Sequence, residues 1–324
     1  MANKKVVVLG GGTGMSFLLK GLKEYPLDIT AVVSVCDDGG STGILRDEFN
    51  MLAVGDIRKV LVSLSRREDD FDGLLNYRFK SEGGLKEHTV GNIILTAAAN
   101  IKGSVQAGIE VLGKVLNLSG KVMPLTEDVV TLIGEMQDGK IIEGEHLITE
   151  ANKKIKRVYY NKEPRIKKEL IKTLENADII VISMGSLYTS IIPTLLSKKV
   201  IDAIDNSKAK IVYSCNLFTQ PGETDGYRVS DHINALNSYL GQRKIDYVIA
   251  SNTVISKAVA KKYQTEEQKD PVKIDYRNIE KTNVILIEDK LASLSTKYGY
   301  KHDSVRLGFL IFSLAFNYNK GDKK

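Results

Sequence analysis

Short runs that are apolar at every position alternate along this chain with longer segments of helical periodicity. A strand that helices cover on both faces is apolar throughout, so these runs are typical of a parallel sheet. The alternation predicts a doubly wound, Rossmann-like α/β fold. The expected strands are Lys4–Leu9, Ile29–Val35, Asp178–Ser183, Ala209–Ser214 and Asp246–Ala250. The expected helices are Met15–Glu24, Asp56–Ser65, Val90–Asn100, Gln106–Leu116, Glu163–Ala177, Ser230–Leu240, Ile255–Tyr263 and Asp303–Asn317.

One stretch interrupts this alternation. Asp138-Gly139 stands between two short alternating runs, at 131–136 and 141–145, which is a strong signal for a β-hairpin. We therefore expect a single Rossmann-like domain over residues 1–318, with residues 121–160 as a small antiparallel excursion. The polar tail, residues 319–324, is expected to fray.

The composition excludes several classes of protein. With 43% hydrophobic and 27% charged residues, the chain has the balance of a globular protein. The net charge of +6 comes from scattered lysines rather than a basic stripe with aromatics, which argues against nucleic-acid binding and suits a small anionic ligand. Cys36 and Cys215 make no disulfide framework. Without a signal pattern or an apolar stretch of roughly 18 residues, we expect a cytoplasmic protein that does not enter the membrane.

A glycine-rich loop, Gly10-Gly11-Gly12-Thr13-Gly14, joins the first expected strand to the first expected helix. Consecutive glycines present backbone N–H groups, and the helix N-terminus adds positive partial charge, so Gly11, Gly12, Thr13 and Gly14 are predicted to bind phosphate. The dinucleotide fingerprint fails because Met15 occupies its sixth position, and the P-loop Gly-Lys-Ser/Thr is absent. A nicotinamide dehydrogenase and a P-loop NTPase are both disfavoured.

Two adjacent carboxylates, Asp37 and Asp38, follow the second expected strand and precede another glycine turn. Such residues bind Mg²⁺, hydrogen-bond a ribose or accept a proton, although Asp and Gly also simply cap and turn. Adjacent residues of an extended chain face opposite ways, so we expect one carboxylate to point into the ligand crevice. Asp37 and Asp38 are the only catalytic and Mg²⁺ candidates, and Gly39 and Ser41 join them as binding candidates.

Polar residues near other expected helix starts and strand ends complete the set of binding candidates. These are Arg58, Asn92, Ser186, Asn216 and Thr219. Arg58 lies one turn into a helix, within reach of a phosphate, and the others offer hydrogen bonds to a base, a sugar or phosphate oxygens. Asp56 fits an N-cap, and His88 is interpreted as a surface or packed residue. No Cys/His spacing matches a zinc site.

Taken in order, these motifs resemble the YvcK-like family of gluconeogenesis factors, which is related to the CofD family of 2-phospho-L-lactate transferases. The match runs from Val6 to about His302-Asp303. The motifs that carry it are Gly10–Gly14, Asp37–Gly43, Gly55–Arg58, Val90–Asn92, Gly185–Ser190 and Asn216–Thr224.

The resemblance implies a bacterial cytoplasmic protein needed for cell shape and envelope growth on gluconeogenic carbon sources. It also implies a UDP-sugar ligand, with UDP-N-acetylglucosamine favoured. The CofD branch instead transfers a phospholactyl group from a guanosine-diphosphate carrier to a deazaflavin, with Mg²⁺. The loops Gly185–Ser190 and Asn216–Thr224 look like the YvcK branch. We therefore expect a nucleotide-sugar-binding regulatory factor without an established reaction, with a CofD-like transferase as the alternative. A homo-oligomer and a regulatory protein partner are compatible with such a factor.

Overall fold

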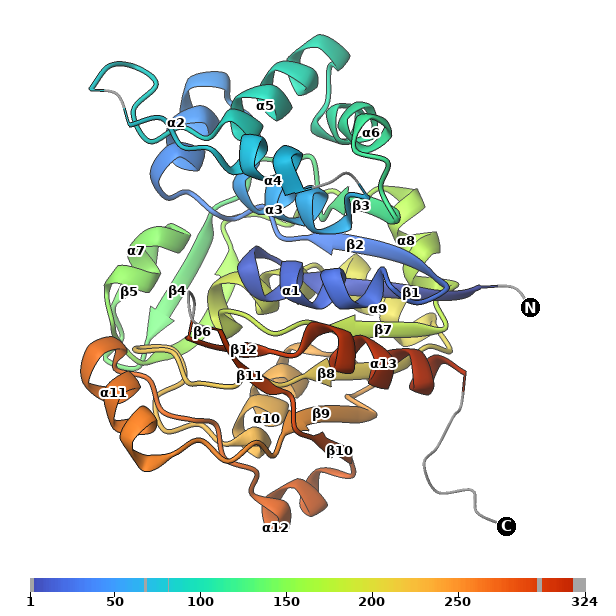
Figure 1. Ribbon diagram of the computed structural model, residues 1–324, viewed down its shortest axis with the longest axis vertical. Coiled ribbons are helices and arrows are strands. Elements are labelled where there is room, and N and C mark those ends of the chain that lie inside the picture. Colours follow the sequence, from blue (N-terminus) through green and yellow to red (C-terminus); the bar gives the residue numbers. More distant parts are fainter. Residues whose placement is uncertain (1–2, 67–68, 81, 296–298, 317–324) are drawn as a thin grey trace.

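A parallel sheet forms the centre of the computed structural model, which describes residues 3–66, 69–80, 82–295 and 299–316. Its seven strands are β1 Lys4–Gly10, β2 Leu27–Val33, β3 Gly120–Pro124, β7 Ile179–Ile182, β8 Lys210–Ser214, β9 Tyr247–Ser251 and β10 Ile285–Asp289. Neighbouring strands are parallel, in the order β10-β9-β8-β7-β1-β2-β3 (Figure 1). The order reverses between β1 and β7, and sheets of this kind bind ligands outside the carboxyl ends of the strands at such a point.

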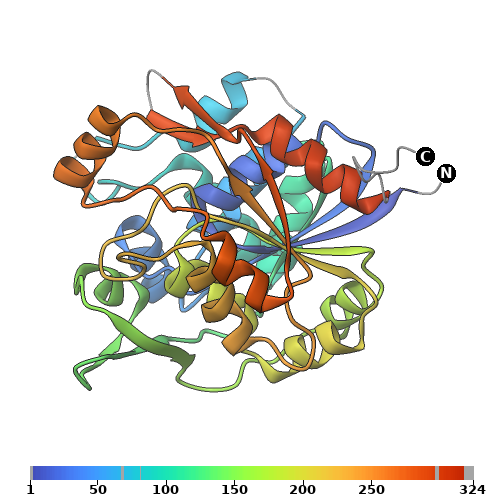
Figure 2. The same ribbon diagram turned by 90° about the horizontal axis from the view of Figure 1, so that it is seen from below.

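The central strands are apolar because helices cover both faces of the sheet. In β1 the residues Val6–Leu9 are fully buried, as is all of β7. On one face lie α1 Gly12–Leu22, α3 Gly55–Leu64 and α13 Ser304–Ala315. On the other lie α8 Lys168–Glu175, α9 Lys198–Asn206 and α10 Val229–Tyr239. Figure 2 shows this division, with the blue α1 and red α13 on the opposite side of the sheet from the yellow helices. The predicted doubly wound α/β fold is confirmed.

The predicted antiparallel excursion is present, but it starts later than expected. Strands β4 Leu132–Met136, β5 Ile141–Glu143 and β6 Ile155–Tyr160 form a separate sheet in the order β5-β4-β6. The start predicted at Lys121 is wrong, because residues 120–124 form β3 and pair in parallel with β2. Only the last three residues of β3 are buried, so this strand carries no long apolar run in the sequence.

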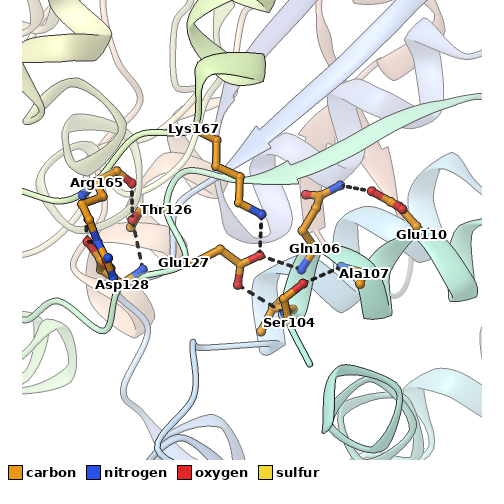
Figure 3. A network of polar contacts seen from close by, with 10 residues as sticks. Ser104, Gln106, Ala107, Glu110, Thr126, Glu127, Asp128, Arg165 and Lys167 are labelled. Atoms are coloured by element: carbon orange, nitrogen blue, oxygen red, sulfur yellow. Dashed lines mark hydrogen bonds and ion pairs between the residues drawn. The ribbon is translucent and has the colours of Figure 1, made fainter. Parts of the chain in front are cut away.

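Ion pairs fasten the two ends of the excursion (Figure 3). Where the chain leaves the core, Asp128 receives hydrogen bonds from the Arg165 guanidinium, with Nε 2.9 Å from Oδ1. The neighbouring Glu127 accepts Lys167 Nζ at 3.1 Å and the backbone N–H of Gln106 at 2.9 Å. Arg165 and Lys167 lie where the chain returns, so the outgoing and returning segments are held against each other and against the start of a helix.

The remaining elements surround this frame. They are α2 Gly40–Phe49, α4 Asp69–Asn76, α5 Val90–Lys102, α6 Val105–Val115, α7 Glu145–Glu150, α11 Lys257–Glu267, α12 Tyr276–Ile279, the turns η1 Leu187–Ile191, η2 Ile192–Leu195 and η3 Glu280–Thr282, and the antiparallel pair β11 Ala292–Ser295 and β12 Gly299–His302. Two expected helices start later than predicted, at Lys168 and Lys257. The predicted frayed tail, residues 319–324, lies outside the described residues. Within the described part of the chain, no helix is long and apolar enough to span a membrane.

Candidate functional site

The glycine-rich loop lies at the carboxyl end of β1, where the strand order reverses. Gly12 is the first residue of α1 and has φ +66°, a left-handed conformation that costs other residues free energy. A side chain at Gly14 would collide with the backbone carbonyl of Met184 in the loop that follows β7. Glycine at these two positions therefore lets the loop turn tightly while packing against the β7 loop.

A cavity of about 500 Å³ opens on this loop. The predicted binding residues that line it come from the loops after β1, β7 and β8: Gly11, Gly12, Thr13, Gly14, Ser186, Asn216 and Thr219. These loops are far apart in the sequence but lie at one edge of the sheet because their strands are parallel. The structure thus places one half of the predicted residues around a single space.

Other residues that line the cavity come from the loop after β8, from α11 and from β12. The rings of Phe218 and Tyr263 stack with their centroids 4.4 Å apart, and the Tyr263 hydroxyl accepts the backbone N–H of Tyr300 at 2.7 Å. Lys301 Nζ lies 5.7 Å from the ring centroid of Phe17. Sequence reasoning missed the contributions of α11 and β12, because a single aromatic or lysine on such an element forms no motif.

Two predicted ligand contacts are already used within the protein. Asn216 accepts the N–H of Gly185 through Oδ1 at 2.9 Å and donates through Nδ2 to the Gly185 carbonyl at 2.7 Å. Thr219 Oγ1 accepts the N–H of Asp270 at 2.9 Å. Both side chains therefore hold loops together at the edge of the cavity.

Carboxylates lie beside the glycine loop, away from this cavity. Asp56 Oδ2 is 2.7 Å from the position that a Cβ on Gly11 would take, and Asp56 pairs with Lys59 at 2.9 Å. Asp37 Oδ2 is 3.0 Å from the corresponding position on Gly55. Burial and the charge of Asp56 raise the pKa of Asp37. Asp56, interpreted from sequence as an N-cap, instead lies inside the first turn of α3 and faces the glycine loop.

Asp38 faces the excursion. Its carboxylate accepts the backbone N–H groups of Glu145 at 3.2 Å and His146 at 2.8 Å, at the start of α7. The N–H of Gly39 donates to Asp37 Oδ1 at 3.1 Å, so the two adjacent aspartates have different surroundings. Burial, with the nearby aspartates adding to it, raises the pKa of Glu145 to about 7. Glu145 was missed because it belongs to the excursion.

Three other predicted residues are buried in two separate groups of polar contacts: Ser41 on α2 and Asn92 on α5 in one, and Arg58 on α3 in the other. Ser41 Oγ lies 2.8 Å from His88 Nδ1, and Asn92 Nδ2 donates to Ser41 Oγ at 3.4 Å. Arg58, predicted to reach a phosphate, instead donates to Asn76 and to the carbonyl of Leu75. Burial lowers the pKa of Arg58. None of these side chains lines the cavity at the glycine loop.

The described residues contain no group of three or more His, Cys, Asp or Glu arranged to hold a metal ion. Asp56 lies against Gly11 and Gly12 of the glycine loop, and Asp37 is close enough to Asp56 for the two carboxylates to interact. Mg²⁺ is commonly held by one or two carboxylates together with substrate phosphates and water. The pair therefore fits Mg²⁺ as a partial ligand set that a bound diphosphate would complete.

Comparison with known proteins decides the family. The model of the CofD family, described as 2-phospho-L-lactate transferase CofD, matches residues 6–292. The chain belongs to this family. A gluconeogenesis factor of Halalkalibacterium halodurans is 44% identical over 290 residues, which cover 89% of this chain and 90% of the relative. The gluconeogenesis factor of Bacillus subtilis is 41% identical and covers 93% of both chains.

Solved structures agree with the sequence relatives. The crystal structure of a Bacillus halodurans protein of the UPF0052 family has a TM-score of 0.91 and 41% sequence identity, covering 96% of this chain and 99% of that chain. The resemblance to the YvcK-like family is confirmed, and the names of the relatives support a function of the gluconeogenesis-factor type.

Proposed function

We propose that this protein is a cytoplasmic gluconeogenesis factor that binds a nucleotide sugar of the UDP-N-acetylglucosamine type and thereby serves cell shape and envelope growth under gluconeogenic conditions. The observation that carries the proposal is the glycine loop of β1, which opens at the helix N-terminus of α1 onto a cavity of about 500 Å³. Cavities of this size hold ligands as large as a drug molecule or a nucleotide.

The diphosphate is proposed to lie on Gly11–Gly14. The 11-residue helix α1 starts at Gly12, so its free N–H groups and its dipole favour negative charge at this position. Lys301 and Lys269 line the same cavity and add positive charge. The Lys301 ammonium lies over the ring of Phe17, which lines the same cavity.

The base or the sugar is proposed to lie against the stacked pair of Phe218 and Tyr263. Both residues line the cavity, and their rings offer an apolar surface next to the polar loops after β7 and β8. Aromatic surfaces bind the flat faces of bases and the apolar faces of sugars, while polar loops supply the hydrogen bonds that fix orientation.

A binding role is favoured over catalysis because the described residues near the loop offer few reactive groups. The Cys36 and Cys215 thiols are buried, which raises their pKa to about 11 and about 12, so they are not thiolate nucleophiles at neutral pH. Burial lowers the pKa of His302 to about 4, which keeps this imidazole neutral.

A CofD-like transferase is the second candidate, and the carboxylates beside the glycine loop favour it. Asp37 and Asp56 could share Mg²⁺ with a diphosphate, and Glu145 has a pKa of about 7, which suits proton transfer near neutral pH. A transferase of this kind would move a phospholactyl group from a guanosine-diphosphate carrier to a deazaflavin.

A thermal-shift and calorimetry panel separates these functions. The panel contains UDP-N-acetylglucosamine, other UDP-sugars, GDP, NAD and a deazaflavin, each with and without Mg²⁺. We expect a UDP-sugar to stabilise the protein, by about 2.7 kcal/mol at a hundredfold excess over Kd. Stabilisation by GDP and deazaflavin with Mg²⁺, but by no UDP-sugar, would favour the transferase instead. Mass spectrometry of mixtures with the phospholactyl donor and acceptor then detects any product, and Asp37→Asn tests whether it depends on this carboxylate.

A further inference from the structure

A buried carboxylate lies within the motif Asn216–Thr224 but is not among the predicted binding residues. Glu223, in the loop after β8, is only 6% exposed. Its hydrogen-bond partners are all neutral groups, and burial raises its pKa. A buried carboxylate costs much free energy unless hydrogen bonds compensate its charge. A glutamate in such a place therefore needs a structural or functional reason.

The hydrogen bonds of Glu223 converge on one short segment. Oε1 accepts the hydroxyl of Ser186 at 2.6 Å and that of Thr189 at 3.4 Å, and Oε2 accepts the backbone N–H of Tyr188 at 3.0 Å. These donors belong to the first turn of η1, which is a π-helix closed by Ile191 N–H to the Ser186 carbonyl at 3.0 Å. Single π-helical turns are rare and are frequently found at functional sites.

The segment that Glu223 holds forms one wall of the cavity. Gly185, Ser186 and Ser190 line the cavity beside the glycine loop, whereas Glu223 does not line it. Asn216, from the same loop as Glu223, binds both backbone polar groups of Gly185. The loop after β8 thus fixes the loop after β7 at two successive points, and the second of these is the Glu223 carboxyl group.

We propose that Glu223 is a positioning residue for the ligand, which sets the orientation of Ser186 and η1 toward the phosphate and sugar oxygens. This inference rests on the proposed nucleotide-sugar binding. A carboxylate accepts hydrogen bonds through two oxygens. A glutamine amide accepts through one oxygen only, because an NH₂ group takes the place of the other. The Glu223→Gln substitution therefore disturbs the wall while changing the volume of the side chain little.

The test compares Glu223→Gln with Asp275→Asn by calorimetry with UDP-N-acetylglucosamine. Asp275 is a matched control, because its carboxylate accepts the hydroxyl and the N–H of Ser230 at the start of α10, away from this cavity. Loss of one or two charge-assisted hydrogen bonds corresponds to a loss of affinity of about tenfold or more for Glu223→Gln. The affinity of Asp275→Asn is expected to stay within about twofold of wild type, even if its melting temperature falls as far as that of Glu223→Gln.

The pH dependence of UDP-sugar affinity is a second measurement, and a purely structural role of Glu223 would leave it unchanged. Protonation of Glu223 removes part of its accepting capacity, so wild-type affinity is expected to fall as the pH falls through the raised pKa of this carboxyl group. Two other ionisable groups lie near Glu223. One is Glu145, which shares a hydrogen bond with Thr189, and the other is the hydroxyl of Tyr188, which pairs with that of Tyr227. These groups are unchanged in Glu223→Gln. Any pH dependence of affinity that disappears in this variant is therefore due to Glu223.

Each outcome has a distinct meaning. A folded Glu223→Gln variant with wild-type affinity and wild-type pH slope would overturn the positioning role alone. Where Glu223→Gln does not fold, Thr189→Val removes one donor at nearly constant shape; a loss of about threefold supports the role, and unchanged affinity overturns it. A wild-type protein that binds no UDP-sugar would overturn the proposed function and this inference together.

Discussion

Replacement of Gly12 by valine tests the phosphate loop directly. Gly12 has φ +66°, and a Cβ there would meet only the Asp56 carboxylate, at 3.6 Å, so the substitution strains the backbone without a severe clash. A left-handed conformation costs a residue with a side chain about 1–2 kcal/mol. The fold should therefore survive with a modestly lower melting temperature.

The effect on the ligand should be much larger. A charge-assisted hydrogen bond contributes about 1.5–3 kcal/mol, so losing two N–H contacts to phosphate corresponds to about 3 kcal/mol or more and at least a roughly hundredfold loss of affinity. Calorimetry with UDP-N-acetylglucosamine measures this loss, and chemical unfolding measures the stability of the same sample.

Gly103→Val is the matched control. Gly103 ends α5 with φ +78°, and a Cβ there would meet nothing within 4 Å. This variant should show a similar loss of stability and unchanged affinity. Wild-type affinity in Gly12→Val, or an equal loss of affinity in both variants, would refute the assignment of the phosphate loop.

Three further results are expected. Arg165 lowers the pKa of Asp128, so their pair contributes stability that is present above the unfolded pKa of Asp128 and is lost as the pH falls through its folded value. Arg165→Ala should remove this dependence from urea unfolding measured from about pH 5 downward, and an unchanged profile would contradict it. Asp56→Asn should lower the pKa of Asp37 by removing a neighbouring negative charge, which carboxyl NMR titration detects; a pKa that stays or rises would show that the two carboxylates do not interact. Lys301→Gln should weaken UDP-sugar binding and reduce its dependence on salt, whereas Lys262→Gln, on the exposed α11, should change neither.

The sequence predicted the sheet well because its chemistry is local. Val6–Leu9 and Ile179–Ile182 are apolar at every position since helices cover both faces, and that pattern is visible without any tertiary information. Strands β3 and β10 were missed as parts of the sheet because only three of the five residues of β3 are buried and none of those of β10. The glycine loop was predicted for the same local reason, since the turn and the helix start that it makes are encoded in five consecutive residues.

The rest of the candidate site depends on contacts between distant segments. Tyr263 and Lys301 reach the cavity from α11 and β12, and neither stands in a motif. Arg58 and Asn92 stand in motifs but are buried and bonded within the protein, Arg58 to the end of α4 and Asn92 to Ser41 of α2. A motif shows which residue types occur together along the chain, whereas the direction of each side chain depends on the elements that pack over it.

The ion pairs at the base of the excursion have a consequence for how this fold tolerates change in chain length. Since Asp128 and Arg165 are in contact, the two points at which the excursion leaves and rejoins the core are only one side-chain pair apart. The entropy of closing such a loop grows slowly with its length, at about 0.6 kcal/mol for each doubling. The segment between them can therefore lengthen or shorten at little cost to the sheet, while the glycine loop, whose neighbours are Asp56 of α3 and the loop after β7, keeps its shape.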